Sequence, residues 1–479
     1  MEQASRTSKE GGWLDATGLP HILRSLGLAV DKAKLGIALI AVLLTFVLGG
    51  VLDWVWTLRP GVAPSAIVQF VDARERGAPY IEPTGDAGIF NTWREYQRRC
   101  VLGLLVSAVD WLIPSDALVA GTPVDAYVRS HSHTGPLRNF INIVYGVCWM
   151  LRHHTLFFIL FGAGALLIWS WAGGAICRAA AVQFTQGEKL TAVQALRFGR
   201  ERLIGGFAVA PCIPLIFIAL IMVLMLLGGM VLRIPVLGDL LGGLGFGFGI
   251  LGGFLMLLLL IGLFVGGNLF WPVVATEGSD AFDAFSRGVS YPLSKPWKTI
   301  LYGLISLVYA GLCWLFVNLL VYYVLMLTRG VVGLGATWFG LWPRGGEGNP
   351  AGKLEALWPL SGFNALYAMP DRSLLSWHEY LSAVFVGLWV LLAIALMWAF
   401  LASFYFSNST VVYFLLRRDV DNIPLDDIWV EEDDGGGVPK PLAPVSSQQS
   451  ASASPNAAER SEAGSAGVAV DNGDTDTDG

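Results

Sequence analysis

The chain has 479 residues, of which 54% are apolar and only 14% are charged, about half the charged share of a soluble domain. The formal net charge is −6, and residues 419–479 alone contribute 14 acidic and 2 basic residues. This composition excludes a soluble globular protein, a disordered chain and a nucleic-acid binder with a basic groove. We therefore expect a membrane protein that carries an acidic tail and has no nucleic acid among its partners.

Long segments without Asp, Glu, Lys or Arg predict the membrane-spanning helices. A spanning helix needs roughly 20 apolar residues, because the hydrocarbon core is ~30 Å thick and a helix rises ~1.5 Å per residue. The uncharged segments are 35–52, 153–177, 203–232, 240–276, 299–328 and 380–416. The sequence thus predicts an all-α fold, a polytopic membrane bundle with six transmembrane helices. Pro211 and Pro214 are expected to kink or break the start of the third.

The parts outside these helices are assigned by composition and periodicity. Ile22, Leu26 and Val30 recur at four-residue spacing, which predicts an interfacial helix, and the last residues contain too few large apolar groups to fold. The apolar run 100–114 is too short to span, so it lies in the interface or packs on the bundle. In chain order we expect a cytoplasmic N-terminal segment (1–34), transmembrane helix one (35–57), an external helical segment (58–143), helices two to five (144–328), an external loop (329–379), helix six (380–416), an acidic juxtamembrane segment (417–434) and a disordered tail (435–479).

Basic residues gather in the loops on one side of the predicted bundle. Short loops rich in Lys and Arg face the cytoplasm. The loops after helices two and four are basic, whereas the short turn 233–239 has only Arg233. The sequence therefore predicts a multi-pass protein of a bacterial inner membrane, with both termini in the cytoplasm.

An internal repeat links the two basic loops, which align at an offset of 89 residues. Thr191 aligns with Asp280, and both are favourable helix N-caps; Thr191 with Gln194 also fits a capping box. Further matched pairs are Glu188 with Glu277, Ala192 with Ala281, Ala195 with Ala284, Leu196 with Phe285, and Gly199 with Gly288. Each loop is predicted to be a short amphipathic elbow between two spans, so that the bundle contains two parallel helix–elbow–helix repeats.

Several segments carry a resemblance to a known family. The elbows "CRAAAVQFTQGEKLTAVQALRFGRERL" and "WPVVATEGSDAFDAFSRGVSYPLSKPWKTILYGL", the turn "RIPVLGDLLGGL" and the end "FLLRRDVDNIPLDDIWVEE" resemble an uncharacterised family of bacterial six-span membrane proteins. More distantly, "VVATEGSDAFDAFSRG" is similar to the membrane domain fused to some glycerophosphodiester phosphodiesterases, which is not their catalytic domain. The resemblance covers most of residues 13–434. It implies a fold and no functional residue.

Two charged groups at the elbows are candidate sites. Lys189, Arg197, Arg200 and Arg202 form a basic group that is predicted to contact lipid headgroups, because each base near an anionic leaflet adds about 1 kcal/mol of attraction. Asp280 and Asp283 are placed to favour a helix N-terminus, and Arg287 is placed to pair with Asp283.

Glycines in and beside the fourth span form a second candidate surface. Five glycines follow one another at spacings of three or four residues: Gly238, Gly242, Gly245, Gly249 and Gly253. Small residues let helices approach closely where lipid gives no hydrophobic drive, so this face is predicted to pack against a neighbouring helix. The alternatives are an oligomer contact and a broken or re-entrant stretch over 237–249.

Signals for metal or redox chemistry are weak. The five cysteines are spread singly without a CxxC pair, and a disulfide between Cys100 and Cys148 stays open. His131 and His133 with His153 and His154 could form an external metal site, but outer-loop polar surface is the preferred interpretation. No cofactor and no catalytic residue are predicted.

These observations favour a non-enzymatic scaffold or accessory subunit that acts through its elbows and tail. Its expected partners are membrane lipids. The acidic segment 426–434 is preferably interpreted as a solvating tail, and the alternative is a docking peptide for a basic protein partner. A second hypothesis is a permease or channel for lipids or weakly polar solutes, which is not driven by a buried carboxylate because the apolar runs contain none. A membrane-embedded lipid enzyme has the least support.

Overall fold

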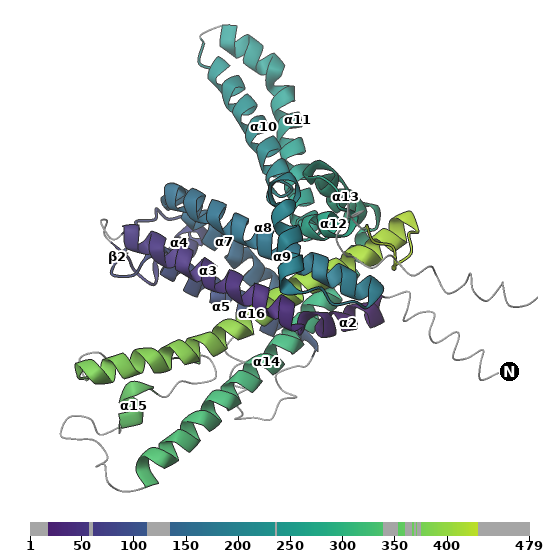
Figure 1. The fold of residues 1–479 in the computed structure, drawn as a ribbon. Helices are drawn as coiled ribbons and strands as arrows, with labels where there is room; N and C mark the ends of the chain where they lie inside the picture. Colours follow the sequence, from purple (N-terminus) through teal and green to yellow (C-terminus); the bar gives the residue numbers. More distant parts are fainter. Residues whose placement is uncertain are drawn as a thin grey trace, which may run out of the picture. The chain divides into compact units, whose positions relative to one another are not determined.

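A computed structural model describes residues 18–56, 61–112, 135–234, 237–338, 353–359, 366–367, 370 and 375–429 (Figure 1). In chain order its elements are α2 (Leu19–Ala29), α3 (Lys32–Trp56), β1 (Gly61–Val62), α4 (Ala66–Glu75), β2 (Thr84–Gly85), α5 (Ile89–Leu112), α7 (Pro136–His153), α8 (Thr155–Gln186), α9 (Ala192–Glu201), the π-helix η2 (Leu203–Phe207), α10 (Cys212–Val231), α11 (Leu237–Gly266), α12 (Phe270–Glu277), α13 (Ala281–Ser294), α14 (Pro296–Trp338), α15 (Lys353–Leu357) and α16 (Trp377–Asp421). The described chain is therefore all-α apart from one short antiparallel pair, β1 with β2.

Six of the described helices are long and apolar enough to cross a membrane: α3, α8, α10, α11, α14 and α16. They coincide with the six predicted spans, which confirms the fold class and makes the chain a multi-pass membrane protein by length and composition. The reason is physical: a backbone in lipid must satisfy its hydrogen bonds internally, and a helix does so within one segment.

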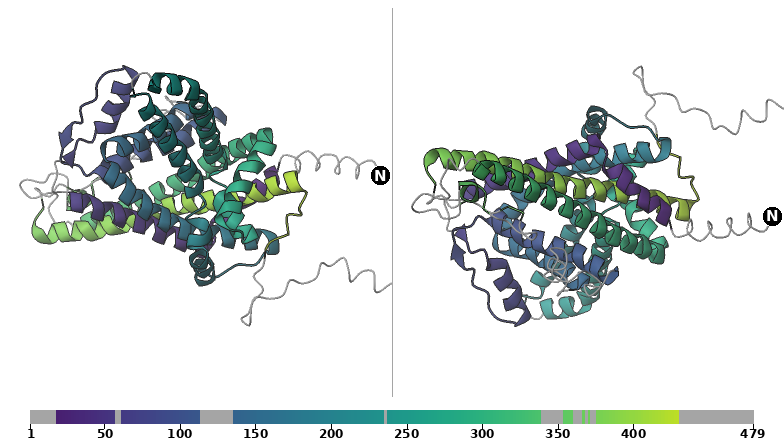
Figure 2. Two further views of the ribbon diagram at one scale, coloured as in Figure 1. Left: turned by 90° about the horizontal axis from the view of Figure 1, so that it is seen from above. Right: turned by 90° about the horizontal axis from the view of Figure 1, so that it is seen from below.

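Helices α8 and α16 supply much of the core. Helices α2, α3 and α12 pack against both of them, and α14 packs along α16 and α2, as the two views of Figure 2 show. Large side chains are fully buried where these helices meet, among them Phe207, Phe270, Tyr302, Trp314 and Tyr413. The core therefore lies around the elbows and the carboxyl-terminal part of α16.

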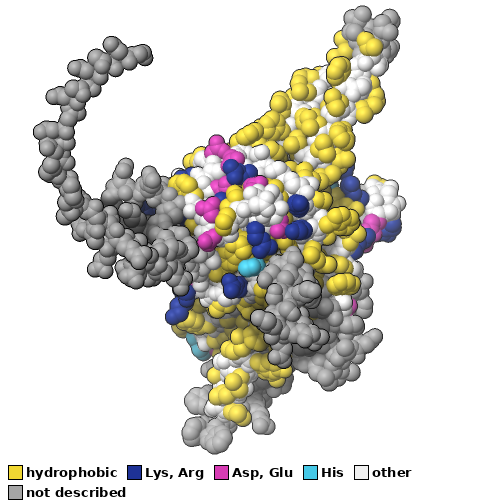
Figure 3. All heavy atoms as spheres, turned by 90° about the vertical axis from the view of Figure 1, so that its right-hand side faces the viewer, with side chains coloured by type: hydrophobic (Ala, Val, Ile, Leu, Met, Phe, Trp, Pro, Cys, Tyr) yellow, Lys and Arg dark blue, Asp and Glu magenta, His cyan; other side chains and the backbone are white. Residues whose placement is uncertain are grey.

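Helices α10 and α11 form an antiparallel hairpin that packs mainly on itself. Only 6% of the most apolar stretch of each helix is buried within the chain, compared with 22–33% for the other four spans. The surface of the hairpin is almost entirely apolar in Figure 3, while charged side chains gather lower on the same face. Lipid or another protein must therefore cover most of this hairpin.

The uncharged segment 240–276 is longer than one span requires, and the structure divides it into two helices. The chain breaks after Gly266 and resumes as α12, and a Cβ added at Gly266 would lie directly against the backbone of Gly288 in α13. The stretch 237–249, for which a broken or re-entrant form was an alternative, is continuous helix in α11. The predicted third span begins later than 203, since the π-helix η2 precedes Pro211 and α10 starts at Cys212.

The interfacial helix predicted from Ile22, Leu26 and Val30 is present as α2, but it packs against α16 and turns a different face inward. Its buried residues include Ile22, Ser25 and Ala29, whereas Val30 is exposed. The described part of the external run, residues 100–112, lies in α5, and its Leu105 belongs to one buried cluster with Trp314 of α14. Of the two predicted alternatives, packing on the bundle is therefore confirmed for the described part of this run.

Close helix contacts generate a prediction about stability. A Cβ added at Gly199 would lie 2.7 Å from the main-chain oxygen of Trp171, whereas one at Gly205 meets no atom within 4 Å. Overpacking typically costs ~1–3 kcal/mol, so Gly199→Ala should lower the melting temperature of the detergent-solubilised protein. Gly205→Ala is the matched control and should leave it unchanged or raise it. Equal melting temperatures would contradict the close packing of α9 on α8.

Candidate functional site

The two predicted elbows are the helices α9 and α13, and both begin at the predicted caps. The Thr191 hydroxyl accepts a hydrogen bond from the Gln194 amide, and the Gln194 side chain completes the capping box. Asp280 accepts a bond from the Asp283 amide at 2.9 Å. Such caps satisfy amides that a helix start leaves without partners.

The matched positions also share their burial. Ala195 and Ala284 are buried, as are Gly199 and Gly288. Each elbow follows a helix that ends at a glycine with positive φ, Gly187 after α8 and Gly278 after α12. The face that carries Ala195 and Gly199 in α9, and the matching face with Ala284 and Gly288 in α13, therefore point inward.

The proposed match of Glu188 with Glu277 is wrong. Glu188 lies after Gly187 in an exposed turn, whereas Glu277 is the last residue of α12, before Gly278. The turn after α8 is two residues longer than the turn after α12, so a constant offset of 89 does not hold there. This difference places Glu277 inside the bundle.

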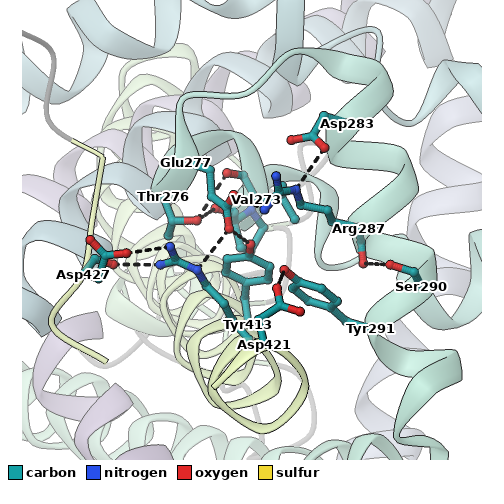
Figure 4. A network of polar contacts seen from close by, with 12 residues as sticks. Val273, Thr276, Glu277, Asp283, Arg287, Ser290, Tyr291, Tyr413, Asp421 and Asp427 are labelled. Atoms are coloured by element: carbon teal, nitrogen blue, oxygen red, sulfur yellow. Dashed lines mark hydrogen bonds and ion pairs between the residues drawn. The ribbon is translucent and has the colours of Figure 1, made fainter. Parts of the chain in front are cut away.

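Glu277 is the centre of a polar network that joins the second elbow to α16 (Figure 4). Its carboxylate accepts a hydrogen bond from Tyr413 and pairs with Arg287 at 2.5 Å and with Arg417 at 3.2 Å. The side chains of Glu277 and Arg417 are only 11% and 9% exposed. A buried charge is stable only when it is paired and hydrogen-bonded, and two cations with one hydroxyl meet that requirement for Glu277.

Further carboxylates extend the network outward. Arg287 also pairs with Asp283 at 2.9 Å, as predicted. Burial by itself would lower the pKa of Arg287, but the bonds to Asp283 and Glu277 raise it, so this guanidinium stays charged. Tyr291 donates to Asp421, and burial together with that carboxylate raises the pKa of the phenol to about 12.

The residues after α16 fold back onto the bundle and contact α8, α12 and α16. Arg417 donates to the backbone oxygen of Asp427 at 2.8 Å and pairs with its carboxylate at 2.9 Å. The Trp429 amide donates to Thr276 at 3.0 Å, and Arg178 of α8 donates to the Trp429 carbonyl at 2.9 Å.

The Trp429 ring lies between two guanidinium groups. Arg202 is 4.6 Å and Arg178 is 5.7 Å from its centroid, within the range of cation–π attraction. The ring also covers Gly278, where a Cβ would lie 2.6 Å from the indole. We call the set Arg178, Arg202, Glu277, Arg287, Arg417, Asp427 and Trp429 the elbow–tail junction.

The predicted basic group is not one open patch. Lys189 lies 3.8 Å from Asp31, and Arg197 pairs with Glu201 at 2.8 Å. Arg202 donates to the carbonyl of Gly278 and faces Trp429, while Arg200 is exposed. Contact with lipid headgroups stays a prediction, and Arg200 is the member best placed for it.

The five predicted packing glycines divide into two groups. Gly238 and Gly242 lie against Val231 and Leu232 at the end of α10, so they pack within the hairpin. A Cβ added at Gly245, Gly249 or Gly253 would meet no atom of a neighbouring element within 4 Å among the described residues. Contact of these three with another chain stays a prediction.

At the other end of the bundle, two histidines lie in an aromatic cluster. His154 bonds to Glu82 at 2.9 Å, and the His153 ring packs against Phe70 and Tyr80. Within the described ranges no three His, Cys, Asp or Glu side chains gather as a metal site requires. His131 and His133 lie outside those ranges. Cys100 and Cys148 are both free thiols.

Compared with known proteins, the chain matches no family model, no curated protein and no solved structure. The resemblance to a six-span family therefore stays a prediction. The elbow–tail junction stands on its geometry alone.

Sequence reasoning found the elbow caps and the Asp283–Arg287 pair but missed the contacts to Arg178, Arg417 and Trp429. Those contacts join residues far apart in the chain, which local spacing cannot reveal. Two signals were available: Arg178 interrupts an otherwise apolar helix end, and Trp429 is a lone aromatic among acidic residues.

The Glu277 network gives the first prediction for this site. Glu277→Gln removes the buried partner of Arg417 and leaves this arginine with only the exposed Asp427 carboxylate. Breaking a buried ion pair costs about 3 kcal/mol. Asp283→Asn, in a pair with both side chains over a third exposed, should cost at most ~1 kcal/mol. Thermal unfolding in detergent measures the cost of each substitution. A double-mutant cycle of Glu277→Gln with Arg417→Gln measures the coupling between these two residues. Additive losses in the cycle would show that the pair does not stabilise the junction.

The Glu82–His154 contact gives a pH dependence. Burial by itself would raise the pKa of Glu82, but the bond from His154 and the nearby histidine charges lower it below 4.5. A carboxyl whose pKa is lower in the folded state adds stability above its unfolded value, and this is lost as the pH falls through the folded value. The melting temperature should therefore fall less steeply below pH 4.5 in Glu82→Gln than in the wild type. If the melting temperatures of the variant and the wild type fell equally steeply in this acid range, the prediction would be wrong.

Proposed function

We propose that this chain is a non-enzymatic scaffold or accessory subunit of a membrane assembly, which holds its acidic C-terminal segment at the elbows for a basic protein partner. The observation that carries the proposal is the elbow–tail junction. It fixes the chain up to Trp429 through Arg178 of α8 and through Arg202, which directly follows the first elbow.

The charges at the junction support a structural joint over a reactive centre. Arg287 and Arg417 each pair with Glu277, and Asp427 pairs with Arg417. Paired groups of this kind have little freedom to bind a substrate or transfer a proton. Charge pairing instead fixes register and orientation between elements.

The sequence beyond the junction supports a basic partner. Glu431, Glu432, Asp433 and Asp434 follow directly after the anchored Trp429. Opposite charge accelerates encounter and selects partners. With the predicted cytoplasmic C-terminus in a bacterial inner membrane, this acidic run would meet cytoplasmic proteins or the cytoplasmic loops of another membrane protein.

A second candidate is a permease or channel for lipids or weakly polar solutes. It is favoured by an open groove between α10 and α11 that is lined mostly by apolar side chains. Flux in proteoliposomes that is lost when Gly245 and Gly249 are made bulky would favour this candidate over the scaffold.

The scaffold proposal is tested by recovery of partners. The full chain and a variant ending at Trp429 are cross-linked in cells, extracted with native lipid into nanodiscs and analysed by mass spectrometry. We expect a stoichiometric basic protein with the full chain and its loss from the shortened variant, because the acidic run is removed while the junction is kept.

A full-length variant with Glu431→Gln, Glu432→Gln, Asp433→Asn and Asp434→Asn separates charge from length. It should lose the partner as the shortened variant does. Retention of a partner by both variants would refute the acidic docking site. Turnover of a lipid by the purified protein alone would refute the non-enzymatic assignment.

A further inference from the structure

A groove runs between α10 and α11 along the hairpin that the rest of the chain leaves uncovered. Its volume is about 610 Å³, within the ~300–1,000 Å³ of small-molecule sites. It is lined by Met222, Met225, Leu226, Gly229, Met230 and Arg233 of α10 and the turn after it, and by Met256 of α11. Four of the nine methionines of the chain therefore meet in one place.

The lining suits a flexible apolar chain. Methionine is unbranched and polarizable, so it adapts to irregular or mobile apolar partners. Gly229 interrupts this wall, and no atom of the protein lies within 4 Å of a Cβ built there. The groove therefore has free space at Gly229 beside methionine side chains that can rearrange around an occupant.

The single charge in the lining lies at one end of the groove. Arg233 follows α10 at the tip of the hairpin and is exposed. A guanidinium offers planar paired donors that fit a phosphate group. A positive charge at this end also disfavours a cation, even though thioethers can bind soft metals.

The length of the groove matches one leaflet of a bilayer. From Met222 to Arg233 the chain advances ~16 Å at ~1.5 Å per residue, about half of the ~30 Å hydrocarbon core. Because α10 has 20 residues, Arg233 lies about one core thickness from the elbows, where lipid headgroups begin. Met222 and Met256 lie near the middle of the same helices.

We propose that the α10–α11 groove binds a phospholipid with a net negative headgroup, whose phosphate contacts Arg233 and whose acyl chain lies along the methionines toward Met222. This site is independent of the elbow–tail junction, and it goes beyond the scaffold function. A fatty acid, a second copy of this chain and a partner helix are competing occupants, and the test distinguishes each of them.

The test uses the full chain in nanodiscs of phosphatidylcholine that contain a small fraction of photoactivatable lipid. The probes are phosphatidylglycerol, phosphatidylcholine and a free fatty acid, each with a diazirine either near the headgroup or at the acyl terminus. After irradiation, proteolysis and mass spectrometry locate the label. Phosphatidylglycerol should label the hairpin most strongly, near Met230 from the headgroup probe and near Met222 and Met256 from the terminal probe.

Two pairs of variants provide the controls. Gly229→Leu fills the groove, whereas Gly228→Leu also has open space around its Cβ and lies outside the lining. Only Gly229→Leu should abolish the localised label. Arg233→Gln should reduce the preference for phosphatidylglycerol roughly fivefold, corresponding to about 1 kcal/mol, whereas Arg152→Gln, at an exposed base elsewhere, should not.

Each remaining outcome overturns the proposal. Equal labelling by all three probes, or labelling unchanged by Gly229→Leu, would show a general lipid annulus. Stronger labelling by the fatty acid would exclude a phospholipid as the occupant. If no lipid labels the groove and the Met225→Cys variant forms cross-links between two copies, a second copy of the chain covers the groove. If this variant instead forms cross-links to another protein, that protein covers it. None of these results depends on the partner recovery that tests the scaffold function.

Discussion

Burial of the Glu277 carboxylate between two arginines is the interaction on which the arrangement of the elbows and the C-terminal end depends. A charge removed from water must be paired and hydrogen-bonded, and Arg287, Arg417 and Tyr413 supply those bonds from two separate helices. The second elbow and the end of α16 are thereby held in one register. Because Arg417 also bonds to Asp427, the same interaction directs the chain back toward Trp429.

The two elbows then have distinct tasks within one repeated plan. Arg202, directly after the first elbow, faces Trp429, and Arg287 of the second elbow pairs with Glu277 at the end of α12. Between them, the carbonyl of Phe207 in the π-helix accepts bonds from Ser170 and Trp271. A π-helix leaves backbone groups outside the usual helical pattern, and here they bind side chains from both repeats. The repeats are therefore joined by polar contacts as well as by apolar packing.

The charged end and the apolar hairpin divide the molecule by the environment each requires. At the elbow–tail junction, charged side chains pair with other side chains of the same chain. In α10 and α11, by contrast, only 6% of the most apolar stretch is buried within the chain. A scaffold needs both properties, a fixed segment for a soluble partner and a free surface within the membrane. The lipid proposed for the groove at Arg233 would attach that surface to the bilayer.

The sequence by itself determined the six spanning helices, the two elbows and their caps at Thr191 and Asp280. These features follow from local rules, because a backbone in lipid must bond within its own segment and a helix start needs a nearby acceptor. Only the tertiary structure decided the break after Gly266, the inward face of α2 and the contacts of Glu277 and Trp429. Each of these depends on contacts between residues that are far apart in the chain. The turn after α8 is two residues longer than the turn after α12, so Glu188 lies in an exposed turn whereas Glu277 ends α12 and joins the polar network.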